Sequence, residues 1–200
     1  MMIKPPELDR ILSGLDSKTV SSSDFDLNPE TVLPEGRVLR DAAVLIGLIE
    51  RAGELHVILT KRSSALKHHP GQIAFPGGKM DAGDDSPETC ATREAFEEIG
   101  LPQTNVKPLG RLASHETVTG FRVTPVLGLI TAPFTEKPET GEVAEIFSVP
   151  LAHLMHLPNF HIEGRRWRGE IRKYYTVPYG PYYIWGATAR ILRTLAEQAQ

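Results

Sequence analysis

The sequence predicts an α/β sandwich built around a mixed β-sheet, and three observations support this fold class. Several runs rich in β-branched and aliphatic residues are separated by short polar stretches, which is typical of strands. Two segments, 86–99 and 187–198, are predicted to be helices, and the second has apolar residues at helical spacing. Strands and helices alternate irregularly along the chain. Its 200 residues suffice for one full core and leave little room for a second domain.

The first part of the chain is predicted to be an arm followed by a hairpin. Residues 1–36 form a peripheral N-terminal arm with a short helix at 7–13 and a serine-rich loop after it, and residues 37–200 form a single domain. From residue 41 the runs AAVLIGLIE and LHVILTKR are separated by RAGE, which predicts two antiparallel strands over 42–50 and 55–62.

The connection that follows, 63–78, is long for a compact domain and is a candidate functional loop. After the helix at 86–99, polar residues 115–121 join two expected strands. The remaining expected elements are strands at 106–114, 122–131 and 142–151, a short helix near 151–156, a hairpin over 160–177 and the terminal helix at 187–198.

The composition excludes several classes of protein. The net charge of −3 does not indicate a surface for nucleic acid or for an anionic membrane. Cys90 is the only cysteine, which rules out an intrachain disulfide and a cysteine zinc site. The start lacks the apolar run of a signal peptide, and the apolar run 42–49 is too short to cross a bilayer. We expect a soluble, cytoplasmic protein, and make no prediction of its oligomeric state.

The helix at 86–99 has well-marked ends. Ser86 can cap its first turn, and Pro87 suits the first helical position, where a backbone N–H would have no partner. Gly100 can adopt the left-handed conformation that ends many helices. At about 100° per residue, two faces follow. The face expected to turn to the core contains Ala91, Thr92, Ala95, Phe96 and Ile99, and the opposite face contains Glu94, Glu97 and Glu98.

Three carboxylates at these spacings repel one another. The helix face could be a solvated acidic surface, or it could be a functional site. Two features favour the site. Arg93 is the only basic residue in the helix and flanks the carboxylates, and the pair Gly77–Gly78 allows the backbone to approach a ligand closely. Clustered carboxylates suit Mg²⁺ or Mn²⁺, which also bind substrate phosphates. The missing positive charge is therefore predicted to be a set of divalent cations.

The segment GGKMDAGDDSPETCATREAFEEIGL resembles the Nudix box, the loop–helix–loop signature of hydrolases that act on a nucleoside diphosphate linked to another group. Its tail, REAFEEIGL, matches the pattern Arg-Glu, aliphatic, any residue, Glu-Glu, any residue, Gly, aliphatic, with Ala95 as the small apolar member. The upstream half departs from the general pattern. Asp84 stands where Glu is expected six residues after Gly78, and its gap to Arg93 is one residue longer. Asp85 has the right gap but would move the opening glycine to position 79.

The preceding segment, 58–78, is similar to the extra signature of the coenzyme A pyrophosphatase branch of this family. Two positions differ: Ile58 replaces Leu, and Lys67 replaces an Arg whose fork would grip a phosphate with two hydrogen bonds. The longer box and the segment 184–192 also resemble this branch. The residues that match the signature at its gaps are Leu59, Thr60, Arg62, Ser63, Gly71, Phe75, Pro76, Gly77 and Gly78.

The resemblance implies a Nudix fold, a mixed sheet between helices, and hydrolysis of the pyrophosphate of coenzyme A with Mg²⁺ or Mn²⁺. Products would be 4′-phosphopantetheine and adenosine 3′,5′-bisphosphate. It implies metal binding by Glu94 and Glu98, with Glu97 as a third ligand or a group that orients the others. Arg93 either acts in catalysis or orients a glutamate or the glycine loop. The substrate-binding candidates are Arg62, Lys67, Gly71, Phe75, Gly77 and Gly78.

Some assignments stay open. A general base outside the box could be Glu116, Glu142 or Glu145, and His68 or His69 could contact phosphate. His153, His156 and His161 are interpreted as structural because they lack a metal-site spacing. The alternatives to coenzyme A hydrolysis are a Nudix hydrolase of ADP-ribose, a reduced dinucleotide or an oxidised nucleotide, a nucleotide-sensing module without catalysis, and a structural protein with an accidental acidic face.

Overall fold

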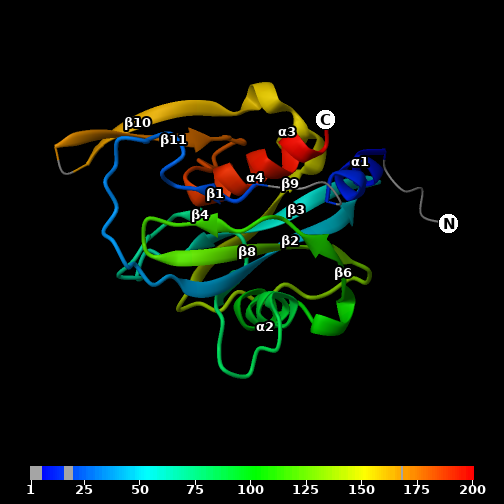
Figure 1. Cartoon of the computed structure of the whole chain (residues 1–200). Helices are drawn as coiled ribbons and strands as arrows, with labels where there is room; N and C mark the ends of the chain where they lie inside the picture. The colour runs from blue at the N-terminus through cyan, green and yellow to red at the C-terminus, as the bar shows by residue number, and fades with distance from the viewer. Residues whose placement is uncertain (1–5, 16–19, 168) are drawn as a thin grey trace.

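The computed structural model describes residues 6–15, 20–167 and 169–200, and Figure 1 shows its arrangement. The α-helices are α1 (Pro6–Leu15), α2 (Pro87–Ile99), α3 (Leu151–Met155) and α4 (Ala187–Gln198), with 3₁₀ turns at Gln103–Asn105 and Leu157–Asn159. The strands are β1 (Ser22–Ser23), β2 (Arg40–Arg51), β3 (Glu54–Arg62), β4 (Ile73–Ala74), β5 (Gly77–Lys79), β6 (Val106–Arg111), β7 (His115–Glu116), β8 (Phe121–Ile130), β9 (Val143–Pro150), β10 (His161–Trp167) and β11 (Glu170–Thr176).

The main sheet is mixed, as the sequence predicts. Its central strand β2 runs antiparallel to β3 and to the short β5, and parallel to β8. The main path of the sheet is β1-β7-β8-β2-β3-β4, with β6 paired to β8 and β9 paired to β3. The pair predicted over 42–50 and 55–62 is β2 and β3. They are joined by a tight turn in which Ala52 and Gly53 have positive φ.

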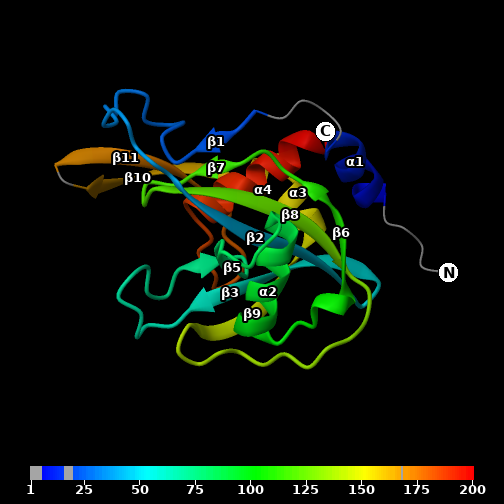
Figure 2. The same ribbon diagram turned by 60° about the horizontal axis from the view of Figure 1, so that its bottom comes forward.

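Helices cover both faces of this sheet. Figures 1 and 2 show α2 on one face and α1, α3 and α4 on the other, with the separate β10–β11 hairpin beside α4. The buried residues form two clusters accordingly. The smaller joins Ala91, Ala95 and Ile99 of α2 to Leu45 and Ile58 of the sheet. The larger lies between the sheet and the other helices. The expected α/β/α sandwich is confirmed.

The ends of α2 are those that the sequence predicts. The Ser86 hydroxyl accepts a hydrogen bond from the Thr89 N–H at 3.2 Å, and Pro87 occupies the first helical position. Gly100 ends the helix in the left-handed conformation, with φ of 73°. Its N–H donates to the Phe96 carbonyl at 2.9 Å, which satisfies one of the carbonyls that a helix end leaves unpaired.

The buried face of α2 differs from the predicted one at two positions. Phe96, expected in the core, is 53% exposed, and Glu98, expected on the outer face, is 6% exposed. At about 100° per residue, Ala91, Ala95 and Glu98 form one continuous stripe, while Phe96 lies beyond its far edge. The sheet therefore contacts α2 along a line rotated toward Glu98, because that carboxylate finds a backbone partner beneath the helix.

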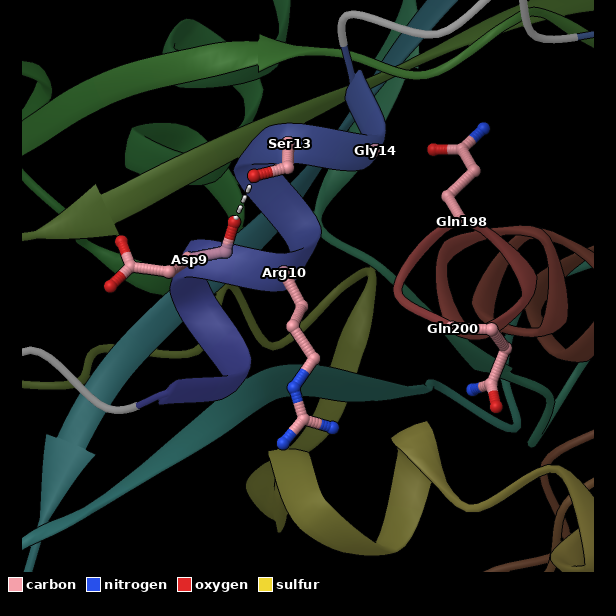
Figure 3. Close-up of a pocket in the computed structure, with 6 residues that line it drawn as sticks. All are labelled: Asp9, Arg10, Ser13, Gly14, Gln198 and Gln200. Atoms are coloured by element: carbon pink, nitrogen blue, oxygen red, sulfur yellow. Dashed lines mark hydrogen bonds between the residues drawn. The ribbon is translucent and has the colours of Figure 1, made fainter.

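The N-terminal arm is not peripheral throughout, which corrects the prediction. Leu8 is 4% exposed and Ile11 is fully buried in the larger cluster. Helix α1 packs against α4 so closely that a Cβ on Gly14 would lie 2.1 Å from the Gln198 carbonyl oxygen. Between the two helices is a cavity of about 400 Å³, shown in Figure 3. The apolar face of α1 therefore completes the core, while the boundary near residue 36 stays a prediction.

The expected elements of the C-terminal half are present. The predicted hairpin is β10–β11, and α4 covers 187–198 as expected. The expected polar connection over 115–121 contains the short strand β7 and a turn. In the parts of the chain that the structure describes, no helix is both long enough and apolar enough to span a bilayer.

Candidate active site

Two glycines at β5 create the space in which the acidic residues of α2 lie. Gly77 pairs with Val44 of β2, and a Cβ on Gly77 would come within 2.5 Å of the Ala43 carbonyl oxygen. On Gly78, a Cβ would lie 2.6 Å from a carboxylate oxygen of Glu94. Real Cβ contacts are not this short, so glycine at position 77 is what permits β5 to run this close to the β2 backbone, and a side chain at position 78 would displace the Glu94 carboxylate.

Glu98 is the buried carboxylate of the site. Its Oε2 accepts a hydrogen bond from the Gly77 N–H at 3.2 Å. Burial, followed by the nearby carboxylates of Glu94 and Glu142, raises the pKa of Glu98 to about 8, while the Gly77 N–H and the charge of Arg62 act in the opposite direction. A carboxylate in this position gains from any cation that approaches it.

Arg93 is held among several acidic side chains. Its Nε and Nη2 donate to the two Asp84 oxygens at 3.0 and 2.8 Å, which is the two-pronged pairing that arginine favours. Its Nη1 donates to Glu94 at 2.9 Å and to Glu97 at 3.2 Å. Hydrogen bonds from the Arg93 guanidinium hold the pKa of Asp84 at about 2. Arg93 thus supplies part of the positive charge that the sequence analysis assigned to cations alone.

The two upstream acids differ in their surroundings. The Asp84 side chain is 2% exposed, and its Oδ2 also accepts the Asp81 N–H at 2.9 Å. Asp85 is exposed to solvent. The structure therefore places Asp84, rather than Asp85, against Arg93. The bonds between Arg93 and Asp84 connect the loop before α2 to the middle of the helix.

Glu94 and Glu97 lie at the outer edge of the same group. The Glu94 side chain is 17% exposed, and its pKa is raised by burial, an effect that Arg93 opposes. Glu97 is 55% exposed and has Arg93 as its neighbour one helical turn back. The three glutamates thus form a series from buried Glu98 to open Glu97.

Arg62 reaches this group from the end of β3. Its charge lowers the pKa of Glu98, against the larger effect of burial. Its backbone accepts the Gly71 N–H at 3.1 Å and donates to the Gln72 carbonyl at 2.9 Å, so the loop 63–71 is closed at its base. The Arg62 Nε is buried without a hydrogen-bond partner in the described residues. A buried donor in this state costs free energy unless a ligand satisfies it.

The other residues of the predicted binding segment are less involved. Lys67, His68 and His69 are exposed on the loop, and Gly71 takes a left-handed conformation with φ of 69°. Phe75 is 4% exposed and packs in the larger core cluster. Its side chain therefore packs in the core beside β5, and its part in substrate binding stays a prediction.

Comparison with known proteins identifies the family of this chain. The model of the NUDIX domain matches residues 38–168. The chain belongs to the Nudix family. Relatives include proteins called uncharacterized Nudix hydrolase NudL. One from Enterobacter sp. (strain 638) is 42% identical over 80% of this chain and 82% of its own. One from Citrobacter koseri is 37% identical over 92% of this chain and 97% of its own.

Solved Nudix structures have the same fold. The Nudix domain of Shewanella oneidensis NrtR, crystallised with ADP ribose, superposes with a TM-score of 0.53 at 14% identity, covering 86% of this chain and 96% of that one. A MutT/nudix family protein from Enterococcus faecalis has a TM-score of 0.50 at 16% identity, covering 84% and 65%. These two structures show the fold. The family model and the NudL relatives show that the protein is a Nudix hydrolase, a pyrophosphohydrolase of nucleotide derivatives.

The fold separates the three general-base candidates of this Nudix hydrolase. Glu142 acts electrostatically on both Glu94 and Glu98. Its own carbonyl accepts the Ser63 N–H at 2.7 Å, beside Arg62. Glu145 instead accepts a hydrogen bond from the Tyr182 hydroxyl at 2.5 Å. Glu116, on β7, forms an ion pair with Arg37. Of the three, Glu142 is the one brought to the Nudix glutamates.

The Nudix family uses divalent metals, and the donor set here suits one. Glu94, Glu98 and Glu142 offer hard carboxylate oxygens, and burial disfavours the charge on Glu98 in the absence of a cation. Within the described residues, no three His, Cys, Asp or Glu side chains are already arranged as a metal cage. Arg93 donates to one oxygen of Glu94 and to Glu97, so the second oxygen of Glu94 is the one that can bind a metal without breaking this bond.

Sequence reasoning missed the connection that holds the Glu142 loop to the Nudix helix. The Glu139 N–H donates to the Glu98 carbonyl at 2.9 Å, and the Glu139 carboxylate accepts the Glu142 N–H at 2.9 Å. The acidic run that contains both residues was visible in the sequence. Its position against the end of α2 was not, because about forty residues separate the two segments.

Proposed function

We propose that this Nudix hydrolase cleaves the pyrophosphate of coenzyme A or its derivatives to 4′-phosphopantetheine and adenosine 3′,5′-bisphosphate, with Mg²⁺ or Mn²⁺. The general activity follows from the family. The choice of coenzyme A rests on the segment 58–78, whose residues end β3, close the loop 63–71 and form β5.

The observation that best supports a phosphate ligand at this segment is the unsatisfied Arg62 Nε. It is a buried donor beside Glu98, and no described residue accepts its hydrogen bond. A phosphate oxygen is a strong acceptor for a guanidinium N–H, and an anion there would also offset the charge of Arg62. Lys67, exposed on the same loop, is suited to the additional 3′-phosphate that distinguishes coenzyme A from ADP-ribose.

Each side chain has a part in the proposed reaction. Glu94 and Glu98 would hold the metal, with Glu142 completing the set or accepting a proton from the attacking water. Arg93 would keep Asp84 and the helix carboxylates in position. A divalent cation bound there would neutralise pyrophosphate charge and lower the pKa of a bound water. Gly77 and Gly78 bring the backbone of β5 close to β2 and to the Glu94 carboxylate.

The test is a substrate comparison with purified protein. Coenzyme A, dephospho-coenzyme A, ADP-ribose and NADH are incubated separately with Mg²⁺ and with Mn²⁺, and the products are separated by chromatography. The expected result is that coenzyme A has the highest kcat/KM and yields the two stated products. Glu98→Gln serves as the inactive control.

Arg62→Met tests whether Arg62 binds a phosphate of the substrate. It should raise KM for coenzyme A at least tenfold, since a charge-assisted bond to phosphate contributes about 1.5–3 kcal/mol. Lys61→Met, the exposed neighbour, is the matched control and should be unchanged. Faster cleavage of ADP-ribose or NADH than of coenzyme A would reject the substrate while leaving the Nudix assignment intact.

A further inference from the structure

The segment that leads into β5 is held through its carbonyl groups. The Gln72 carbonyl accepts the Arg62 N–H at 2.9 Å, and the Ala74 carbonyl accepts the Thr60 hydroxyl at 3.2 Å. Both donors belong to β3, the strand that pairs with this segment. We call residues 72–76 the lead segment.

The lead segment ends at the acidic residues of the candidate active site. The Pro76 carbonyl accepts the Leu45 N–H of β2 at 2.8 Å. The next N–H along the chain is that of Gly77, which donates to the Glu98 carboxylate at 3.2 Å. The place of this donor relative to Glu98 therefore depends on how the lead segment lies.

The carbonyl between the two β3 contacts, that of Ile73, accepts its hydrogen bond from a distant part of the chain. The Thr188 hydroxyl donates to it at 3.0 Å, across 115 residues of sequence. Thr188 lies in the first turn of α4 and is 6% exposed. Within the described residues, β4 pairs with β3 alone, so this hydroxyl satisfies a carbonyl at an edge of the sheet.

The first turn of α4 is itself fixed in place. The Gly186 N–H, just before the helix, donates to the Tyr175 carbonyl of β11 at 3.0 Å. Ala189 and Leu192 are fully buried, in the same core cluster as Ile73. A hydroxyl on a turn held in this way restrains the carbonyl that it contacts.

A second buried threonine of α4 shows what this hydroxyl could have done instead. Thr194 is 9% exposed, and its hydroxyl donates to the Arg190 carbonyl of the same helix at 3.1 Å. Bonding one turn back is the usual choice of a threonine inside a helix. Thr188 differs, because its hydroxyl leaves the helix and contacts the lead segment.

We propose that Thr188 is a positioning residue of the Nudix site: its hydrogen bond to Ile73 holds the lead segment so that the Gly77 N–H meets Glu98. Without this bond a buried carbonyl would have no partner, and the segment would shift to regain one. A small displacement near a catalytic group lowers turnover strongly. The competing explanation is that the pairing of β5 with β2 alone fixes Gly77, and that Thr188 only fastens α4 to the sheet.

Amide hydrogen exchange, measured by NMR without turnover, separates the two explanations. Thr188→Val replaces the hydroxyl by a methyl group in a side chain of nearly the same shape. Exchange of the Gly77 N–H should become roughly tenfold faster or more, because its restraint is weakened. The Gly100 N–H, bonded at the end of α2, should exchange as in the wild type. Thr194→Val is the matched control and should leave both amides unchanged.

Steady-state kinetics with coenzyme A and Mg²⁺ gives the second readout. Thr188→Val should lower kcat by about fivefold or more and change KM by less than about twofold. KM is spared because Arg62 keeps its own backbone bonds to Gln72 and Gly71. Thr188→Ser keeps the hydroxyl and should approach the wild type. Thr188→Ala differs from it only by that hydroxyl and should behave as Thr188→Val does, so this pair decides the question if Thr188→Val does not fold.

Three results would overturn the inference. One is a folded Thr188→Val with the Gly77 exchange and the kcat of the wild type, which would leave Thr188 a role in stability alone. Another is faster Gly77 exchange with an unchanged kcat, because the position of Gly77 would then not matter to the reaction. The third is an equal loss in Thr194→Val.

The inference requires a Nudix reaction but not coenzyme A as the substrate. The exchange measurement needs no substrate, and ADP-ribose replaces coenzyme A in the kinetics if coenzyme A is not cleaved. Faster Gly77 exchange and a lower kcat for ADP-ribose in Thr188→Val would then support the role of Thr188 while the proposed substrate fails. Cleavage of coenzyme A at equal rates by wild type and Thr188→Val would give the reverse.

Discussion

The Glu98 carboxylate lies beneath α2 and accepts the backbone N–H of Gly77 at 3.2 Å, with 6% of the residue exposed. This contact joins the glycine segment of β5 to the acidic helix. It also explains why the helix turns Glu98 rather than Phe96 toward the sheet. A buried acid with one backbone donor is poorly compensated, so its environment favours a cation or a proton.

Stability of the metal-free protein should depend on Glu98. The pKa of Glu98 is raised from an ordinary 4.5 to about 8 in the folded state. The folded state therefore holds a proton that the unfolded state releases, so the stabilisation is present below pH 4.5 and is lost as the pH rises through about 8. Urea unfolding in EDTA across this range should show the decline, on the order of a few kcal/mol. Glu98→Gln should show a flatter profile; the same slope in both proteins would contradict the assignment.

Metal binding should offset the cost of the buried charge on Glu98. Activity should disappear in EDTA and return with Mg²⁺ or Mn²⁺, because the substrate phosphates and the glutamates need a shared cation. Mn²⁺ should raise the melting temperature of the wild type, since a ligand that binds only the folded state stabilises it. Glu94→Gln should show a smaller rise. Glu50→Gln is the control, because Glu50 is exposed at the far end of β2 and forms no ion pair within the described residues.

A methyl group on Gly78 should displace Glu94. The added Cβ would lie 2.6 Å from the Glu94 carboxylate, so the side chain must move. Gly78→Ala should lower kcat by roughly 10- to 100-fold, the loss typical when metal ligands are misplaced. Gly83→Ala is the matched control, because nothing lies within 4 Å of its Cβ position. Steady-state kinetics on both variants provides the comparison. Equal activity in both would show that Glu94 can move without consequence.

The upstream acid can be identified by a pair of substitutions. Asp84→Asn removes the charge that Arg93 binds through two nitrogens, whereas Asp85→Asn changes an exposed residue. We expect a loss of activity of at least tenfold in the first and almost none in the second.

Arg93 lowers the pKa of Asp84 from 3.8 to about 2 in the folded protein. The stability that this ion pair contributes is therefore present above pH 3.8 and is lost as the pH falls through about 2. Acid unfolding of the two variants should differ accordingly, and a larger effect at Asp85 would reverse the assignment.

The N-terminal helix should contribute to stability. Ile11 is fully buried, so Ile11→Ala should lower the free energy of unfolding by about 2–5 kcal/mol. Val20→Ala should cost almost nothing, because Val20 is 86% exposed. Equilibrium urea unfolding measures both. Similar stability of the two variants would restore the prediction of a peripheral arm.

Local chemistry made several features predictable from residues alone. Ser86, Pro87 and Gly100 mark the ends of α2 because capping depends on neighbours within one turn. The pair of β2 and β3 was predictable because a short turn brings adjacent strands together. The Nudix box was recognisable because the family holds its Arg and Glu residues at set positions on one helix.

Other features depend on segments that meet only in the folded chain. The rotation of α2 toward Glu98 requires the Gly77 N–H, which lies twenty-one residues earlier and is presented by β5. Glu142 could be selected from three acids only after β9 had been placed beside β3. Arg172 of the hairpin lies over the Phe25 ring, 5.7 Å from its centroid, although the two residues are far apart in the sequence. Helical periodicity and turn residues act over a few positions, whereas burial and charge are set by contacts between distant parts of the chain, and these exist only when the whole sheet has formed.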